Sequence, residues 1–563
     1  MGNGSINILI GGEAGQGLVT IGQILARTLV RSGYFIVVTQ SYQSRIRGGH
    51  NTFAVRVSAE EIAAPQEPVN LLVALNEETV RLHRDELVSD GLIVADEGVA
   101  PADEACLHVP FEELAQDKFV NVVALGVIAS LLGLDRKLVI KTMEDAFGKK
   151  DAEVAEQNEK AFDDSFKWCA GQRPAIRQLG GVEESAERLM MNGNEAMALG
   201  AISSGLRLCS FYPMTPATSI CLNLAAHAKS MGLVVEQAED EIAAINMAIG
   251  ASFAGAPSMV ATSGGGFALM TEAVSLAAVT ETPIVVVIAQ RPGPGTGLPT
   301  RTEQADLEFV LHAGHGEFPR VIFAPGTVEE CFYLTRKAFE LAERYQGPTF
   351  ILTDQFLADS YRSVAPFALE DSGEVQVGAA FDDVVEPYHR YAVTESGVSP
   401  RLLPGLTEHL VVADSDEHAE DGHITEDLTV RKTMVEKRLR KGDGIRDEVI
   451  PPEADGEDEP DILLVSWGSS KGAVREAATE LRSDGQRVGT LHFCQVWPLV
   501  PEQFVARLEA TKQVVCVESN ALGQFARLIR RETGFEVTRS VRRYDGLPLT
   551  PAYILNELKG KRG

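Results

Sequence analysis

The segment of residues 209–306 restricts the fold of this chain more than any other part of its sequence. Short apolar runs alternate in it with helical patterns, and most runs end in a turn rich in glycine or proline. Residues 283–289 are apolar almost without interruption, which is typical of a strand buried on both faces of a parallel sheet. The segment therefore predicts a doubly wound α/β domain, whose turns meet at the carboxyl edge of the sheet, where ligands usually bind.

Four turns of this segment are suited to ligand binding or catalysis. The first is Tyr-Pro-Met-Thr-Pro at residues 212–216, where prolines on both sides of Thr215 stiffen the loop that holds its hydroxyl. In the second, Glu241 begins an alanine-rich helix, where the helix dipole favours a carboxylate. A turn of three glycines at residues 264–266 precedes a further helix, and residues 291–301 place glycines and prolines between two arginines. The alternative for Glu241 is a solvated helix face, and for the arginines it is a surface salt bridge.

The chain opens with another combination of strand, glycine turn and helix. Residues 6–10 predict the strand and residues 11–17 the turn, in which Gly15 and Gly17 expose backbone N–H groups that suit a phosphate or carboxylate. The spacing is G-x-x-G-x-G, and no acidic residue follows the next strand, residues 35–39, which argues against NAD. A plain tight turn is the alternative interpretation.

Two arginines, Arg45 and Arg47, lie beside a Gly-Gly turn and ahead of a predicted strand at residues 52–57. Paired guanidinium groups next to flexible backbone can bind phosphate or carboxylate through bidentate hydrogen bonds. We therefore count them, with Gly15 and Gly17, as candidate contacts to an anion, and a solvated turn is the alternative.

The overall composition excludes several classes of protein. The net charge of −29 disfavours binding to nucleic acid or anionic membranes, because phosphate is repelled at long range. No apolar run is long enough for a membrane span and no basic signal stands at the start, so we expect a cytoplasmic protein. The seven cysteines show no C-x-x-C spacing, so we expect no metal site in this chain.

With 563 residues, the chain has room for three to four domains of about 150 residues each. Changes in composition divide it into an α/β domain at residues 1–185, a second at 186–368 and a third at 461–563. Residues 369–460 between them are rich in acidic residues, glycine and proline, which is typical of a connector or arm.

Taken together, the motifs resemble the α subunits of 2-oxoacid:ferredoxin oxidoreductases, in the form with a γ domain fused ahead of the α domain. The resemblance is strongest to 2-oxoglutarate:ferredoxin oxidoreductase, also called 2-oxoglutarate synthase, and covers nearly the whole chain. The sequences that carry it, in order, are Tyr-Pro-Met-Thr-Pro, Glu-Ile-Ala-Ala, Thr-Ser-Gly-Gly-Gly-Phe and Arg-Pro-Gly-Pro-Gly-Thr-Gly-Leu-Pro-Thr. The segments Gly-Glu-Ala-Gly-Gln-Gly and Ser-Arg-Ile-Arg-Gly-Gly resemble the γ domain. Many relatives instead carry isoleucine at Met214, proline at Gly265 and serine at Gly295.

The resemblance implies three doubly wound α/β domains: a γ domain, a thiamine-binding pyrimidine-type domain and a domain like the transketolase C-terminal domain. It also implies CoA-dependent oxidative decarboxylation of 2-oxoglutarate to succinyl-CoA with ferredoxin as acceptor, or the reverse reductive carboxylation. The alternatives are the same chemistry on pyruvate or branched-chain 2-oxoacids, and a non-catalytic subunit with a thiamine-type fold.

Residue roles follow from the same resemblance. Glu241 would face N1′ of the aminopyrimidine of thiamine diphosphate, where a hydrogen bond favours the imino tautomer that takes the C2 proton. Gly265 and Gly266 would contact the cofactor. Thr215 would bind the substrate carboxylate near C2, with Tyr212 and Pro216 forming the wall. For the distal carboxylate of 2-oxoglutarate, Arg301 is the first candidate and Arg291 the second.

The chain lacks the other half of a thiamine site. Its only Gly-Asp-Gly, residues 442–444, has no asparagine after it until Asn520, so we interpret it as a solvated turn rather than a diphosphate loop. The resemblance therefore implies a β subunit that brings the diphosphate motif, Mg²⁺ and a [4Fe-4S] cluster. We expect an α₂β₂ complex with ferredoxin, 2-oxoglutarate and CoA as partners, and with Gly15, Gly17, Arg45 and Arg47 as candidate anion or CoA contacts.

Overall fold

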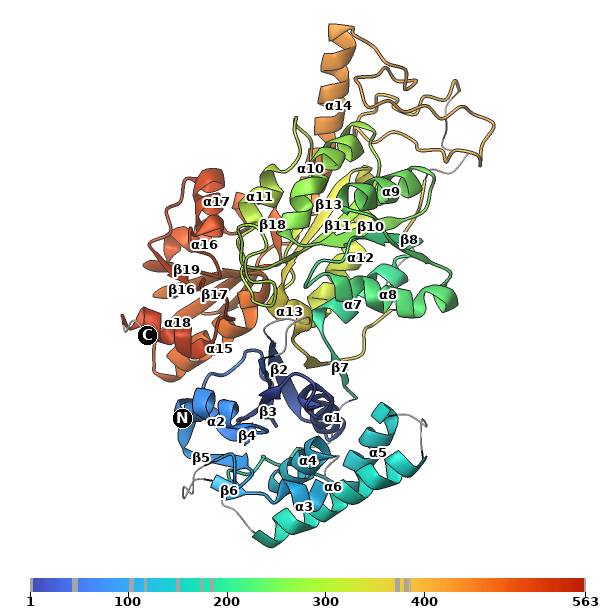
Figure 1. The fold of residues 1–563 in the computed structure, drawn as a ribbon. Coiled ribbons are helices and arrows are strands. Elements are labelled where there is room, and N and C mark those ends of the chain that lie inside the picture. The colour runs from blue at the N-terminus through green and yellow to red at the C-terminus, as the bar shows by residue number, and fades with distance from the viewer. Residues whose placement is uncertain are drawn as a thin grey trace.

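The computed structural model of the protein contains three β-sheets of eight, seven and five strands, each packed against helices (Figure 1). This arrangement confirms the predicted α/β class. The structure describes residues 4–42, 49–100, 106–115, 119–147, 152–172, 176–182, 187–369, 375–378, 384 and 386–560.

The first sheet is mixed rather than wholly parallel, with strand order β6-β5-β4-β1-β3-β2-β14-β7. β3 runs antiparallel to both of its neighbours, β1 and β2, because it follows β2 directly along the chain. The N-terminal elements are β1 (Ile6–Glu13), α1 (Leu18–Arg31), β2 (Phe35–Ser41), β3 (His50–Ser58), β4 (Val69–Ala74), α2 (Glu77–His83), β5 (Leu87–Ala95), β6 (Cys106–His108), α3 (Phe111–Ala115), α4 (Val120–Leu131), α5 (Arg136–Phe147) and α6 (Ala152–Gln172).

Two short strands of this sheet come from farther along the chain. β7 (Leu189–Met191) and β14 (Arg362–Val364) pair with each other, and β14 also pairs with β2. They flank the segment that forms the second sheet, so residues beyond 186 complete the first sheet. The boundary between the first two domains stays a prediction.

The second sheet has the order β18-β12-β13-β11-β10-β8-β9 and is parallel except for β18. All seven residues of β11 are buried, as predicted for a central parallel strand. Its alternate side chains enter two different hydrophobic clusters, one on each face. The elements are α7 (Gly193–Ser203), β8 (Leu208–Phe211), α8 (Thr218–Met231), β9 (Val234–Gln237), α9 (Glu241–Phe253), β10 (Ser258–Thr262), α10 (Gly264–Val279), β11 (Ile284–Gln290), α11 (Leu307–His312), β12 (Val321–Phe323), α12 (Val328–Tyr345), β13 (Pro348–Asp354) and α13 (Gln355–Asp359).

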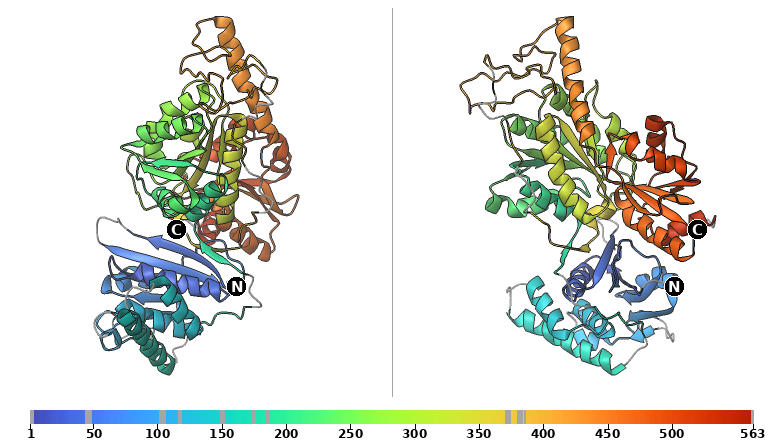
Figure 2. Two further views of the ribbon diagram at one scale, coloured as in Figure 1. Left: turned by 90° about the vertical axis from the view of Figure 1, so that its right-hand side faces the viewer. Right: turned by 180° about the vertical axis from the view of Figure 1, so that it is seen from behind.

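The third sheet has the order β15-β17-β16-β19-β20 and is parallel except for β15. One strand of this region, β18 (Gln495–Trp497), crosses over to pair with β12 of the second sheet. The two sheets lie side by side, and the N-terminal domain packs below both of them (Figure 2). The other elements are β15 (Glu453–Gly456), β16 (Ile462–Trp467), α15 (Lys471–Ser483), β17 (Val488–Phe493), α16 (Val505–Ala510), β19 (Gln513–Glu518), α17 (Gln524–Thr533), β20 (Arg539–Arg542) and α18 (Pro551–Leu558).

The predicted connector contains a long helix, α14 (Leu428–Asp447), which projects from the second domain (Figure 1). Residues 442–444 lie inside this helix, so the prediction of a solvated turn there is wrong. The helix is held by Lys437, whose Nζ lies 2.6 Å from Glu281 with both side chains fully buried, and by Lys441. Burial alone would raise the pKa of Glu281, but the two ammonium groups lower it to about 2.

Candidate active site

Four loops of the second domain lie at the same edge of its sheet. They follow β8, β9, β10 and β11, which are mutually parallel neighbours, so their carboxyl ends point the same way. A cleft at this edge is the usual ligand site of such a sheet. The loops are the four that the sequence singles out.

Glu241 is the first residue of α9 and is only 4% exposed. Asp240 caps the helix by accepting a hydrogen bond from the backbone N–H of Ala243 at 2.7 Å, which leaves Glu241 free of that task. Among the described residues, no side chain or backbone group donates a hydrogen bond to the Glu241 carboxylate. Because Glu241 is buried, the alternative of a solvated helix face is wrong. A buried carboxylate without a partner requires a hydrogen-bond donor from elsewhere.

Gly266 lies directly against Glu241. A Cβ atom at this position would be 2.2 Å from Oγ1 of Thr262 and 2.7 Å from Oε1 of Glu241, so only glycine fits. Residues 264–266 form the first turn of α10, after Ser263, rather than the separate turn that the sequence predicts. Gly265 is exposed on the same turn, and a Cβ atom there would lie 3.7 Å from the Gly295 carbonyl.

Thr215 of the first loop and Arg291 of the fourth are in contact. Nη1 of Arg291 donates a hydrogen bond to the backbone carbonyl of Thr215 at 2.7 Å. Burial lowers the pKa of Arg291, while the charge of Asp306 acts in the opposite direction. On the other side, Nδ2 of Asn194 donates to the carbonyl of Pro216 at 2.9 Å, so the loop is held by one helix, α7, and by the residue that follows β11.

Tyr212 and Arg301 belong to the first and last of the four loops. Tyr212 is 40% exposed on the surface of the first loop. Arg301 packs against the third domain, because a Cβ atom at Gly546 would lie 3.0 Å from its own Cβ. No carboxylate in the described part of the chain forms an ion pair with Arg301. Its guanidinium therefore stays available to an anionic ligand.

The structure adds two acidic residues that the sequence does not single out. Asp306 lies against the start of α10, since a Cβ atom at Gly264 would be 2.4 Å from its Oδ2. Burial raises the pKa of Asp306 to about 6, although Arg291 acts against it. Burial, and then the charge of Asp306, raise the pKa of Glu303 to about 7. Shifts of this kind are typical of functional sites.

The third domain holds this loop through Gln304, which is 1% exposed. Its side chain accepts from the backbone N–H of Ser519 at 2.9 Å and donates to the carbonyl of Trp467 at 2.9 Å. Its backbone carbonyl accepts from Nδ2 of Asn520 at 3.1 Å. The position of the loop with Arg301 and Asp306 is therefore set by a domain that lies more than 150 residues further along the chain.

The candidate anion contacts of the N-terminal domain lie at the start of α1. Gly15 and Gly17 both have positive φ, 98° and 75°, which explains the glycines, and Gly17 is the cap of the helix. Arg45 and Arg47 lie outside the described residues. Within the described residues, no group of three or more metal-ligating side chains could hold an ion. No described helix is long and apolar enough to cross a membrane.

Comparison with known proteins covers nearly the whole chain. Residues 199–437 match the family described as pyruvate flavodoxin/ferredoxin oxidoreductase, thiamine diphosphate-binding. Residues 7–168 match pyruvate ferredoxin/flavodoxin oxidoreductase, and residues 460–554 match pyruvate:ferredoxin oxidoreductase core domain II.

Individual relatives are similar over their full length. The 2-oxoacid:ferredoxin oxidoreductase subunit alpha of a Sulfolobus species is 32% identical over 96% of this chain and 94% of its own. The 2-oxoglutarate oxidoreductase subunit KorA of Mycobacterium tuberculosis is 28% identical over 93% of this chain and 87% of its own. A solved structure of 2-oxoglutarate:ferredoxin oxidoreductase from Magnetococcus marinus, with 2-oxoglutarate, coenzyme A and succinyl-CoA bound, has a TM-score of 0.93, 33% identity and 99% coverage of both chains.

These matches confirm the resemblance that the sequence motifs carry, and they extend from the N-terminal domain to the third domain. Identity above 30% over almost the entire length is far beyond a shared fold alone. The chain belongs to the family of 2-oxoacid:ferredoxin oxidoreductase alpha subunits.

Proposed function

We propose that this chain is the α subunit of an enzyme that converts 2-oxoglutarate and CoA to succinyl-CoA and CO₂ with ferredoxin as electron acceptor, or catalyses the reverse reaction. The observation that carries the proposal is Glu241, a buried carboxylate to which no described residue donates a hydrogen bond, at the same sheet edge as the Thr215–Arg291 contact. The Magnetococcus marinus enzyme, which binds 2-oxoglutarate, CoA and succinyl-CoA, supports the choice of substrate.

The residues around Glu241 fit thiamine diphosphate. The carboxylate needs a donor, and Gly266 lets α10 pack closely against it, since any side chain at this position would collide with Glu241 and Thr262. Thiamine diphosphate, when bound, supplies an electron sink for the carbanion left by loss of CO₂. Glu241 would form a hydrogen bond with N1′ of the pyrimidine. This bond would favour the imino tautomer, whose exocyclic nitrogen can accept a proton.

The substrate would be bound at both of its ends. The Arg291 guanidinium contacts the backbone carbonyl of Thr215. We propose that this guanidinium and the Thr215 hydroxyl bind the carboxylate next to the reacting carbon. Arg301 has no ion-pair partner among the described residues and suits the distal carboxylate of 2-oxoglutarate. Arg291 remains the second candidate for the distal group, and Tyr212 and Pro216 would form the wall.

The edge that holds Glu241 is open and apolar on its outer side, as expected if a β subunit covers it. α9 and α10 pack together and expose large apolar side chains next to the candidate site. Ile242 is 50% exposed, Met247 45% and Leu269 52%. An exposed apolar surface of this kind marks a protein interface. We propose that the β subunit binds here, in an α₂β₂ complex, and brings the diphosphate motif, Mg²⁺ and the [4Fe-4S] cluster.

CoA would approach from the N-terminal domain. The start of α1 at Gly15 and Gly17 offers backbone N–H groups to its phosphates. Tyr42 donates a hydrogen bond to Asp359 of α13 at 3.1 Å, which brings the chain just ahead of Arg45 and Arg47 to the second domain. We propose that both arginines contact CoA, and that the protein is cytoplasmic.

The proposal is tested by coexpression with a candidate β subunit and measurement of methyl-viologen reduction that depends on CoA and thiamine diphosphate. We expect 2-oxoglutarate to be preferred over pyruvate and 2-oxoisovalerate. Glu241→Gln should lower kcat by roughly 10²- to 10⁴-fold, because the proton relay through N1′ is lost. The exposed neighbour variant Glu239→Gln is the control and should retain activity.

Two results would redirect the proposal. Equal rates on all three 2-oxoacids would support the proposed reaction but exclude 2-oxoglutarate as its preferred substrate. Full turnover by Glu241→Gln in a cofactor-loaded complex would favour the non-catalytic subunit instead.

A further inference from the structure

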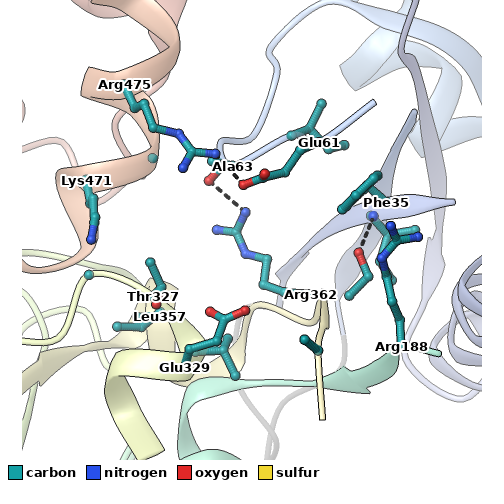
Figure 3. A pocket seen from close by; sticks show the side chains of 17 residues that line it. Phe35, Glu61, Ala63, Arg188, Thr327, Glu329, Leu357, Arg362, Lys471 and Arg475 are labelled. Atoms are coloured by element: carbon teal, nitrogen blue, oxygen red, sulfur yellow. Dashed lines mark hydrogen bonds and ion pairs between the residues drawn. The ribbon is translucent and has the colours of Figure 1, made fainter. Parts of the chain in front are cut away.

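A cavity of about 270 Å³ lies where all three domains meet, away from the four loops of the candidate active site. Its wall combines β2 and the loop at residues 61–63 of the N-terminal domain with β14, the start of α12, and the start of α15 (Figure 3). A volume of this size holds a small metabolite rather than a peptide or a nucleic acid.

Two arginines in the wall form no ion pair with any carboxylate in the part of the chain that the structure describes. Nη1 of Arg362 donates to the carbonyl of Ala63 at 2.8 Å, and Nη1 of Arg188 donates to the carbonyl of Gly33 at 2.6 Å. The guanidinium of Arg188 also stacks 3.8 Å above the ring of Phe35. No acidic side chain of the described residues lies within 4.0 Å of either guanidinium. Both groups therefore keep their positive charge available to the cavity.

The other cations of the wall are already neutralised. Nζ of Lys471 forms ion pairs with Glu330 and Glu453, and Arg475 forms one with Glu61. Burial lowers the pKa of Arg362 to about 10, which shows that its charge is poorly solvated. Within the described residues, Arg362 and Arg188 thus differ from their neighbours in having no direct ion pair, although the charges of Glu476 and Glu329 act on Arg362.

The start of α12 adds to the positive potential. This helix has 18 residues, and Thr327 caps it by accepting from the backbone N–H of Glu330 at 3.1 Å. Val328 and Glu329 line the cavity, and their backbone N–H groups belong to the first turn of the helix, where the helix dipole is positive. One feature opposes anion binding: the Glu329 carboxylate lies beside Arg362 and has no hydrogen-bond or ion-pair partner of its own in the described part of the chain (Figure 3).

We propose that this cavity binds a small dianion, either a phosphate or a dicarboxylate, between the guanidinium groups of Arg188 and Arg362 at the start of α12. Two guanidinium groups, each with several N–H donors, favour a ligand with anionic oxygens at two positions, as in a phosphate or a dicarboxylate. Because the wall comes from three domains, the ligand ties them together.

The cavity is linked to the candidate active site through α13. Leu357 of this short helix lines the cavity, and the backbone N–H of the preceding residue, Phe356, donates to Oγ1 of Thr302 at 3.3 Å. Thr302 follows Arg301 directly in the chain. A ligand in the cavity therefore packs against the helix that supports the Arg301 loop.

The experiment measures thermal unfolding and calorimetric binding of the αβ complex with inorganic phosphate, AMP and succinate. At least one of these anions should raise the unfolding temperature, because a ligand of the folded state stabilises it. Arg188→Gln should weaken the binding about tenfold or more, since one charge-assisted contact is lost. Glu329→Gln should change the affinity in the opposite direction, because it removes the opposing charge.

The three anions and a further variant separate the sources of binding. Binding of phosphate and AMP but not succinate identifies a phosphate ligand, and the reverse identifies a dicarboxylate. The proposal is overturned if none of the three binds, or if Arg188→Gln and Glu329→Gln both leave the affinity unchanged. It is also overturned if binding is lost in Arg291→Gln but kept in Arg188→Gln, because the anion then lies in the candidate active site.

Discussion

At the scale of single residues, the acidic pair Asp306 and Glu303 gives the candidate site a charge that changes near neutral pH. Burial raises the pKa of Asp306 to about 6 and that of Glu303 to about 7. Both groups lose their protons as the pH rises from about 5 to 8, so a negative charge develops on Asp306, next to Arg291, and a second one on Glu303, next to Asp306. The affinity of the site for an anionic 2-oxoacid should therefore fall over this range.

Asp306→Asn should remove part of this pH dependence. We expect KM for 2-oxoglutarate to rise with pH in the unmodified enzyme, and to be roughly threefold to tenfold lower at pH 8 in the variant, because one repulsive charge near the substrate is absent. Steady-state kinetics between pH 5.5 and 8.5 measure the effect. Glu317→Gln, an exposed acid on a neighbouring loop, is the control. An unchanged KM–pH profile in Asp306→Asn would show that its charge does not reach the substrate.

At the scale of elements, the approach of α10 to Glu241 depends on one missing methyl group. A Cβ atom at Gly266 would come within 2.2 Å of a buried strand residue, Thr262, and within 2.7 Å of the Glu241 carboxylate. The absence of a side chain at Gly266 thus allows both the close packing of α10 against β10 and the position of the Glu241 carboxylate.

Gly266→Ala should destabilise the protein by about 1–3 kcal/mol and abolish most of the activity, because the added methyl group displaces either the helix or Glu241. Thermal unfolding and methyl-viologen reduction measure the two effects. Gly250→Ala is the matched control for stability, since it lies in α9 with open space around the position. Equal unfolding temperatures for the two variants would mean that α10 adjusts freely.

Some elements could be predicted from the sequence and others could not. The start of α9 at Glu241 and the buried strand β11 follow from local patterns, a capping acid and an unbroken apolar run. The interior of α14 was missed, because Gly-Asp-Gly favours a turn locally while buried ion pairs with Glu281 hold the helix. The antiparallel course of β3 and the pairing of β14 with β2 depend on contacts between distant segments, which no local pattern encodes.

Some residues of the candidate site could likewise be predicted from the sequence, and others could not. The turns with Thr215, Glu241 and Arg291 stand out as motifs, and parallel strands bring them to one edge. Asp306 and Glu303 do not stand out, because their raised pKa values come from burial of a loop that the third domain holds through Gln304. Because contacts with another domain cause this burial, the sequence around Asp306 and Glu303 does not indicate it.

At the scale of the whole molecule, the N-terminal domain is attached to the third domain by Glu476 of α15. Its Oε1 accepts hydrogen bonds from the backbone N–H groups of Ala63 and Ala64 at 2.6 and 2.9 Å. Its Oε2 forms an ion pair with Arg56 at 2.7 Å, in which the side chains are 7% and 16% exposed. The same loop accepts the hydrogen bond from Arg362, so the Glu476 carboxylate is one of the groups that hold the corner where the three domains meet.

Glu476→Ala should therefore loosen the N-terminal domain rather than unfold its core. Removing one partner of a buried ion pair costs about 3–5 kcal/mol, because the Arg56 charge and two backbone donors lose their acceptor. Hydrogen exchange at residues 60–64 should accelerate, while exchange in β11, which belongs to a separate core, should not. Glu480→Ala, four residues further along the same helix and exposed, is the control. If exchange at residues 60–64 were equal in both variants, Arg362 and the surrounding apolar contacts would be sufficient to hold the domains, and the CoA contacts proposed for the N-terminal domain would not depend on Glu476.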